Sequence, residues 1–278
     1  MCDLLAAGSN VIATPFLFYP AAHGAALADQ LTDACLRGRT SVHGTGINPG
    51  FVGDLLVLVA SGLLRSVERI AVHEVGNWSL LKSRAMVIDN ARFGSPPQDA
   101  ILTANPYAGV MGGYFKESLH MVAAGLGLEL DGCTETQDLV VAEEPVDILS
   151  GRIEVGTVSG QHFHWAGVVE GREPLTIDAW WWVGAERPAT YPAERPDGWS
   201  IDIEGSPSMR LSMLALASLD PASSLPIKAH VDATSVATAM HAVNAIPVVC
   251  AAEPGIRTFL DLSLITGRGV RLAPCDGA

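Results

Sequence analysis

The sequence predicts an α/β unit built on an incomplete parallel sheet, together with an α+β unit whose sheet is mixed or antiparallel. First, short apolar strands alternate with helical patterns near the N-terminus, which is typical of parallel strands joined by crossovers. Second, the middle of the chain changes to long alternating segments joined by turns, which is typical of paired antiparallel strands. Third, a late helical pattern could return to the first unit.

The opening unit is predicted from residues 1–64. Residues 10–15 read as a short buried strand that a proline ends, and residues 40–43 read as a second strand that runs into a glycine-rich turn. A helix over residues 20–38 lies between them, and a largely buried helix follows over residues 51–64. Two parallel strands cannot bury both faces of a sheet, so we expect that another chain supplies more strands or that they are missing.

The central unit is predicted from alternating segments. Residues 153–169 and 175–183 read as two paired strands joined at the turn 170–172. Residues 76–113 are rich in turns and difficult to assign. Further expected elements are strands over 67–75, 200–204 and 209–217, and a helix over 114–125.

A helix is expected over residues 232–246, with Val236, Met240, Val243 and Ile246 along one side. This helix could pack on the opening unit. We therefore expect residues 1–50, completed by residues 230–278, to form a partial dinucleotide-binding domain. Residues 51–229 are expected to form a substrate and oligomerisation domain.

The composition is typical of a compact globular protein, with 49% hydrophobic and 17% charged residues among 278. The formal net charge of −13 argues against a nucleic-acid partner, because 17 basic residues spread along the chain do not form a phosphate-binding cluster. No signal-peptide pattern opens the chain, and the cysteines show no paired spacing. The apolar stretch 51–64 is too short to span a bilayer. We expect a cytoplasmic protein without a membrane partner.

The most specific string in the sequence is Gly44-Thr45-Gly46-Ile47-Asn48-Pro49-Gly50-Phe51. It resembles the turn that joins the dinucleotide domain to the substrate domain in dihydrodipicolinate-reductase-like dehydrogenases, especially the 2,4-diaminopentanoate dehydrogenase group. Residues 10–15, 73–77, 205–209 and 238–247 resemble the same group. The order and spacing of these stretches extend the resemblance over most of the chain.

The resemblance implies a Rossmann-type parallel sheet and NAD or NADP as cofactor. Members of the group begin with a strand, a GxGxxG-type turn and a helix, which hold the pyrophosphate of the cofactor. No such segment precedes Asn10, and no GxGxxG stands elsewhere, so we expect the cofactor affinity of this chain alone to be severely reduced. The paired histidines and the lysine motif of true dihydrodipicolinate reductases are also absent, and that reaction is not assigned.

The cofactor-binding candidates lie at the ends of the first two strands. Ligands bind at the carboxyl ends of strands in open α/β sheets, and the resemblance places residues 13–15 beside the nicotinamide. Glycines in residues 44–50 allow close approach of the backbone to a ligand. The alternatives are an ordinary strand-ending turn and a turn in which the Asn side chain serves only its own backbone. The candidates are Ala13, Thr14, Pro15, Gly44, Thr45, Gly46 and Asn48.

The catalytic candidates are Glu74, Asn77 and Lys82, which follow the third predicted strand where the resemblance places the reductase histidines. An amine or imine substrate favours a carboxylate, and a substrate carboxylate favours a lysine. Hydride transfer needs no protein nucleophile, so the protein orients the substrate and handles one proton. The alternative is a surface loop.

Two further patterns carry weaker signals. His162 and His164 share one face of a strand, a spacing that can hold a metal, but no third ligand is clearly placed and we assign no metal. The run Trp180-Trp181-Trp182 is expected to divide between a core face and an exposed or interface face. Because exposed aromatics often pack on a second subunit, we expect a homo-oligomer.

Two functions from different classes follow. The first is an NAD(P)-dependent dehydrogenase or reductase that acts on an amino acid, a diamine or a related imine. The second is a non-catalytic binding or interaction protein that has lost cofactor binding. A third possibility, a metal hydrolase that uses His162 and His164, predicts bound zinc, which we do not expect.

Overall fold

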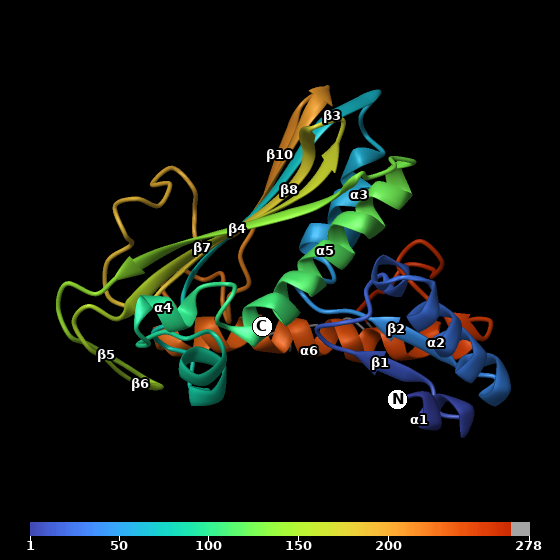
Figure 1. The fold of residues 1–278 in the computed structure, drawn as a ribbon, viewed down its shortest axis with the longest axis horizontal. Coiled ribbons are helices and arrows are strands. Elements are labelled where there is room, and N and C mark those ends of the chain that lie inside the picture. The colour runs from blue at the N-terminus through green and yellow to red at the C-terminus, as the bar shows by residue number, and fades with distance from the viewer. Residues whose placement is uncertain (268–278) are drawn as a thin grey trace, which may run out of the picture.

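The computed structural model describes residues 1–267. A three-stranded parallel sheet and a six-stranded mixed sheet dominate the fold, and in the view of Figure 1 a long helix runs below the mixed sheet and overlaps the parallel sheet. The fold class predicted from the sequence is therefore confirmed at the level of a mixed α/β protein with one parallel and one mixed sheet.

The parallel sheet has the strand order β1-β2-β11. Two strands come from the predicted opening unit, and the third comes from near the C-terminus and pairs with β2. Helix α2 packs its Leu31, Ala34 and Cys35 against this sheet, where all three side chains are buried. The elements are α1 (Cys2–Ala6), β1 (Val11–Ala13), the 3-10 turn η1 (Pro20–His23), α2 (Ala25–Gly38), β2 (Ser41–Gly44) and β11 (Gly255–Ile256).

The mixed sheet has the strand order β10-β9-β3-β8-β7-β4. Strand β3 runs parallel to β8, and every other neighbouring pair is antiparallel. The predicted hairpin turn is confirmed, because Glu170 and Gly171 both have positive φ between β7 and β8. The strands are β3 (Ser66–Asn77), β4 (Gly132–Val141), β7 (Val158–Val169), β8 (Arg172–Trp182), β9 (Gly198–Ser206) and β10 (Met209–Met213).

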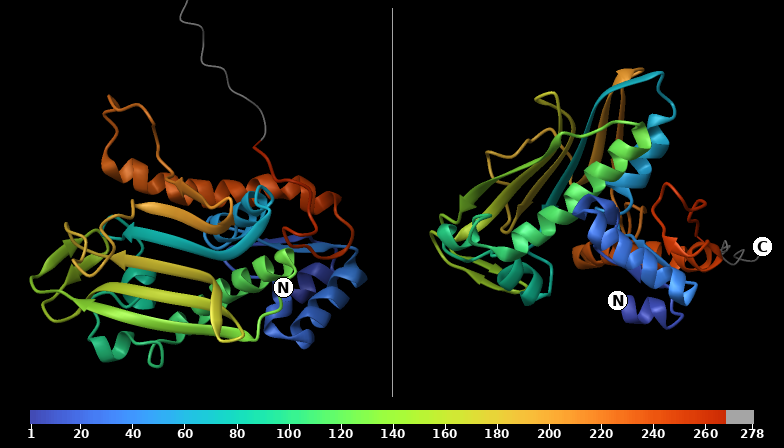
Figure 2. Two further views of the ribbon diagram at one scale, coloured as in Figure 1. Left: turned by 90° about the horizontal axis from the view of Figure 1, so that it is seen from above. Right: turned by 45° about the vertical axis from the view of Figure 1, so that its right-hand side comes forward.

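One face of the mixed sheet is covered by helices, as both views in Figure 2 show. Helix α5 (Pro106–Leu126) crosses this face, and Phe115 stacks on Trp165 of β7 with ring centroids 4.1 Å apart. Asn105 caps the helix by accepting a hydrogen bond from the Tyr107 N–H. The remaining elements are η2 (Val52–Leu56), α3 (Val57–Ser61), η3 (Ala85–Asn90), α4 (Pro97–Ala100), β5 (Val146–Ile148) and β6 (Gly151–Ile153).

Helix α6 (Ile227–Ala251) contacts β1 and β2. By length and composition alone it could cross a membrane, and only 11% of its most apolar 18-residue window is buried. Val236, Met240, Val243 and Ile246, predicted to share one side, are all exposed. The side of α6 that contacts the parallel sheet therefore includes smaller residues such as the buried Ala245.

Several predicted boundaries were wrong. The helix expected over residues 51–64 starts as the π-helical turn η2 and ends at Ser61. The strand expected over 153–169 is interrupted, because residues 151–153 pair with β5 and β7 begins only at Val158. Strand β10 ends at Met213 rather than at residue 217. Each error lies where a turn interrupts an apolar stretch, which periodicity alone does not detect.

Candidate functional site

The turn over residues 44–50 joins β2 to η2, and close packing requires its glycines. Gly44 lies against the backbone of Leu17, where a Cβ would collide with the Leu17 carbonyl. Gly50 has a φ of +115°, and a Cβ there would collide with the backbone of Gly46. Gly44, Thr45 and Gly46 are buried. These glycines therefore serve chain packing, and their contact with a cofactor stays a prediction.

His241 of helix α6 contacts this turn through hydrogen bonds. Its Nδ1 lies 2.7 Å from the Thr45 hydroxyl and 3.1 Å from the Gly46 carbonyl oxygen. The ring also packs edge-on against Phe51 and stacks on Phe259. Burial lowers the pKa of His241, so the imidazole is neutral near pH 7. Residues 238–247, which resemble the 2,4-diaminopentanoate dehydrogenase group, thus include His241, whose ring positions the turn.

Asn48 and Glu74 meet where the turn reaches the mixed sheet. The Asn48 amide donates a 2.7 Å hydrogen bond to Glu74 Oε2, and the Trp199 indole N–H donates a 2.9 Å bond to the same oxygen. The Trp181 indole N–H donates a 2.8 Å bond to Oε1. Glu74 lies within β3, with Trp181 on β8 and Trp199 on β9. Three strands and the turn therefore fix one carboxylate.

The environment of Glu74 is electrostatically unusual. Burial raises the pKa of its carboxyl group, and the three donors from Asn48, Trp199 and Trp181 act in the opposite direction. All three donors are neutral, and within residues 1–267 no cationic side chain forms a salt bridge with Glu74. The carboxylate can therefore take up a proton or face a cationic ligand without breaking an existing ion pair.

Asn77 and Lys82 lie elsewhere. The Asn77 amide donates a 2.7 Å bond to the Gly184 carbonyl, and its oxygen accepts a 2.9 Å bond from the Ser79 N–H, so its side chain braces two loops. Lys82 is exposed, and its charge acts on Asp232 at the start of α6. Glu74 and Asn77 are part of β3 and do not follow it as expected.

Residues 13–15 end β1, as predicted. Ala13 is buried and its carbonyl accepts a 2.9 Å bond from the Thr45 N–H, while Thr14 and Pro15 are exposed. The next residues, Phe16 and Leu17, border an open pocket of about 400 Å³. The other lining residues are His23, Leu27, Tyr114 and Glu117.

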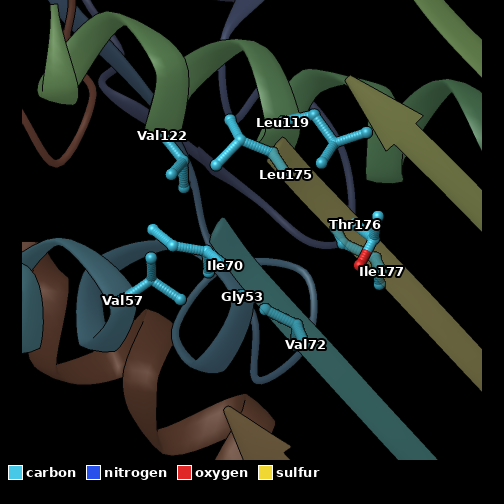
Figure 3. Close-up of a pocket in the computed structure, with 9 residues that line it drawn as sticks. All are labelled: Gly53, Val57, Ile70, Val72, Leu119, Val122, Leu175, Thr176 and Ile177. Carbon is cyan, nitrogen blue, oxygen red and sulfur yellow. The ribbon is translucent and has the colours of Figure 1, made fainter. Parts of the chain in front are cut away.

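A second cavity lies in the core between β3, β8, α3 and α5 (Figure 3). Its volume is about 10 Å³, roughly that of one water molecule. Eight of its nine lining residues carry no polar side-chain group, and Thr176 supplies the only hydroxyl. We interpret this cavity as a small packing void and not as a ligand site.

His162 and His164 share a face of β7, as predicted, and both bind Asp178 Oδ1, at 2.9 and 2.8 Å. Desolvation alone would raise the pKa of Asp178, but the bonds from the two histidines hold it well below its usual range. The hydrogen bond to Asp178 raises the pKa of His164. In the part of the chain that the structure describes, no group of three or more His, Cys, Asp or Glu side chains could hold a metal ion.

The sequence analysis missed His23 and Glu117, which line the open pocket, and the buried Asp54, whose pKa the charge of Glu117 raises. Glu117 and Asp54 are 1% and 0% exposed. A signal was present, because both acids interrupt helical stretches that are otherwise apolar at buried positions. His23 gave no such signal, since it follows Pro20 in a short turn.

The parallel sheet, the mixed sheet and the turn that brings Asn48 to Glu74 define a mixed α/β protein. A family model described as "2,4-diaminopentanoate dehydrogenase C-terminal domain" matches residues 51–269. The chain belongs to this family, and the suspected resemblance is confirmed.

Two curated relatives agree with this assignment. The chain is 25% identical over 250 residues to a 2,4-diaminopentanoate dehydrogenase of Acetoanaerobium sticklandii, with 88% of this chain and 63% of the relative covered. It is 27% identical over 241 residues to an amine dehydrogenase of Streptomyces virginiae, with 85% and 64% covered. The chain thus spans just under two thirds of the length of these relatives.

A solved structure, an amine dehydrogenase from Mycobacterium smegmatis, matches with a TM-score of 0.68 at 18% identity. The match covers 96% of this chain and 72% of the other. At this identity the likeness shows a shared fold.

Proposed function

We propose that this chain functions in an NAD(P)-dependent oxidoreductase that acts on an amino acid, a diamine or a related imine. The observation that carries the proposal is membership of a family described by a dehydrogenase domain, together with two relatives whose names describe dehydrogenases of amino compounds. The carboxylate of Glu74 has only neutral hydrogen-bond partners, which favours a ligand that is positively charged or that exchanges a proton with this group.

A nicotinamide cofactor fits part of this chain. Thr14 and Pro15 are exposed at the carboxyl end of a parallel strand, a position suited to contact with the nicotinamide ring. The buried backbone next to them is formed by Ala13, Gly44, Thr45 and Gly46. No GxGxxG turn for the pyrophosphate occurs in the printed sequence. The cofactor, when bound, supplies the hydride chemistry.

The proposed roles of the protein residues are binding, orientation and proton handling. Glu74 would hold a proton or face the substrate nitrogen, because its raised pKa favours exchange. Asn48 would keep the carboxylate oriented through its amide. Asn77 would act as a positioning residue through its loop contacts, and exposed Lys82 would meet a substrate carboxylate. The homo-oligomer and the cytoplasmic location stay predictions.

The alternative function is a non-catalytic binding protein. It is favoured by the buried state of residues 44–46, whose glycines are closely packed against neighbouring backbone. This alternative predicts no affinity for either nicotinamide cofactor.

One titration separates the two functions. NADH and NADPH are titrated into the protein while nicotinamide fluorescence is recorded, and an amine is then supplied with the oxidised cofactor. We expect weak saturable binding of one cofactor and slow formation of its reduced form. Glu74→Gln should lower turnover by about 100-fold, because one proton-handling group is lost. Glu204→Gln, which removes an exposed acid from β9, is the matched control. No binding of either cofactor would contradict a catalytic role for this chain.

A further inference from the structure

Asp54 is a buried carboxylate that holds the turn over residues 44–50. It lies in η2, shortly after the turn, and is 0% exposed. Its Oδ2 accepts a 2.5 Å hydrogen bond from the Gly50 N–H, whereas its Oδ1 is buried and has no partner within residues 1–267. Buried acceptors without a partner are rare in folded proteins. The strongest contact of the Asp54 side chain is therefore its bond to the turn.

The same turn carries the contact of this bond to Glu74. Gly50 lies two residues after Asn48, whose amide donates a 2.7 Å bond to Glu74 Oε2. Gly53 leaves space for this amide, because a Cβ on Gly53 would lie 2.9 Å from Asn48 Oδ1. Burial raises the pKa of Glu74, and Asn48 has the largest opposing effect among its three donors. A change in how Asp54 holds Gly50 therefore reaches Glu74 through one short segment.

Helix α5 sets the affinity of Asp54 for a proton. Desolvation raises the pKa of Asp54 to about 6, and the charge of Glu117 adds to the rise. The Ser118 hydroxyl and the Gly50 N–H act in the opposite direction. Glu117 is 1% exposed, and its own partners are the Tyr19 N–H and the His23 ring. The acid that acts on Asp54 is thus a second buried carboxylate.

The other elements around η2 bring no opposing charge to Asp54. Helix α3 has no titratable side chain, and Val72 of β3 and Ile177 of β8 lie beside Gly53. On β9, Asp202 and Glu204 alternate with buried core residues and so lie on the other face of the sheet. The nearest acid on the core face of β3 is Glu74, which the turn connects to Asp54.

We propose that Asp54 is a positioning residue whose proton controls how firmly Asn48 is held against Glu74. When Asp54 is ionised, the Gly50 N–H donates a charge-assisted bond, which is stronger than a bond to a neutral carboxylic acid. The turn then keeps the Asn48 amide on Glu74, and this donor favours the charged carboxylate. When Asp54 is protonated, the bond to Gly50 weakens and Glu74 takes up a proton more readily. The inference describes the regulation of the site in the proposed function, and it rests on that function only for its effect on turnover.

The test uses the indoles that bind Glu74 and needs no cofactor. Trp181 and Trp199 donate to the Glu74 carboxylate, so their indole N–H resonances in an NMR spectrum of the full chain report on this group. Trp181→Phe and Trp199→Phe assign the two signals. The Trp199 donor shares Oε2 with Asn48, so we expect its signal to shift with pH, with a midpoint near the Asp54 pKa of about 6.

Two variants decide whether Asp54 causes this shift. Asp54→Asn keeps an oxygen for the Gly50 N–H but cannot ionise, so the step near pH 6 should be lost and the Trp199 signal should stay near its low-pH position. Glu117→Gln removes the charge that raises the pKa of Asp54, so the midpoint should move to a lower pH. Asp33→Asn removes an exposed carboxylate from α2 and should leave the native curve unchanged.

A step near pH 6 that persists in Asp54→Asn would overturn the proposal. An unchanged midpoint in Glu117→Gln would overturn it as well, and this second variant still decides if Asp54→Asn does not fold.

Turnover measurements keep this proposal separate from the proposed function. If the chain reduces a nicotinamide cofactor with an amine, the acidic limb of its turnover against pH should move in Asp54→Asn. An Asp54-dependent NMR step without cofactor binding would refute the oxidoreductase function of this chain and leave the role of Asp54 intact. Turnover without an Asp54-dependent step would refute only the positioning role.

Discussion

Two carboxylates, Glu74 and Glu117, are held in opposite ways. Glu74 sits in the centre strand of the mixed sheet and receives three neutral donors from two indoles and an amide. Glu117 sits on a helix, and its partners come from a loop and a short 3-10 turn beside an open pocket. The first carboxylate is fixed by regular structure, and the second can exchange a partner. The difference suggests a rigidly held carboxylate in the sheet and a more adaptable carboxylate on the helix.

The largest expected effect is a loss of stability, and it compares Gly50 in the turn beside Glu74 with Gly24, which follows His23 beside Glu117. Gly50→Ala should lower the free energy of unfolding by about 3 kcal/mol or more, because positive φ strain adds to a backbone collision with Gly46. Gly24→Ala, at φ +96° with open space around it, should cost about 1 kcal/mol. Urea unfolding of both variants measures the contrast. Equal losses of unfolding free energy in the two variants would show that the turn over residues 44–50 is not more rigid than the backbone at Gly24.

The next effect concerns Asp54 beside Glu117. Its folded pKa of about 6 lies above its ordinary value of 3.8, so the folded state binds the proton more tightly than the unfolded state. Its contribution therefore favours folding below about pH 4 and is lost as the pH rises through 6. As the pH rises from about 4 to about 8, the free energy of unfolding of Asp54→Asn should increase by about 2–3 kcal/mol relative to that of the native protein. A stability difference that does not change with pH would contradict this assignment.

A smaller effect separates the two glutamates directly. Glu74→Gln should destabilise the fold by about 2 kcal/mol, because an amide NH₂ replaces one acceptor and leaves one donor without a partner. Glu117→Gln should cost about 1 kcal/mol or less, since the amide keeps an oxygen acceptor for the Tyr19 N–H and an NH₂ that can pair with a ring nitrogen of His23. Thermal and urea unfolding of both variants provide the comparison. A larger loss for Glu117→Gln would reverse the assignment of rigid and adaptable sites.

Much of the fold followed from local patterns in the sequence. The parallel opening strands, the hairpin around residues 170–172 and the late helix all depend on periodicity and turn chemistry, which are local properties. Strand β11 was missed because two residues carry no periodic signal, and β2 orders them from a distance of more than 200 positions. The exposed side of α6 was unpredictable, because apolar residues occur around its whole circumference.

The site was predicted in part. Asn48 and Glu74, 26 positions apart, form a hydrogen bond in the structure, and the string around each residue had singled both out. Their two tryptophan partners come from strands whose order in the sheet no short-range pattern specifies. The pairing of Glu117 with His23 spans 94 positions and depends on how α5 meets η1, so it could only emerge from tertiary packing.

The most direct test of the contrast between the two carboxylates is a pair of crystal structures, one of Glu74→Gln and one of Glu117→Gln. In Glu117→Gln we expect His23 to change its side-chain position, while Asn48, Trp181 and Trp199 keep their positions around Glu74. An unmoved His23 together with displaced tryptophans in Glu117→Gln would contradict the account.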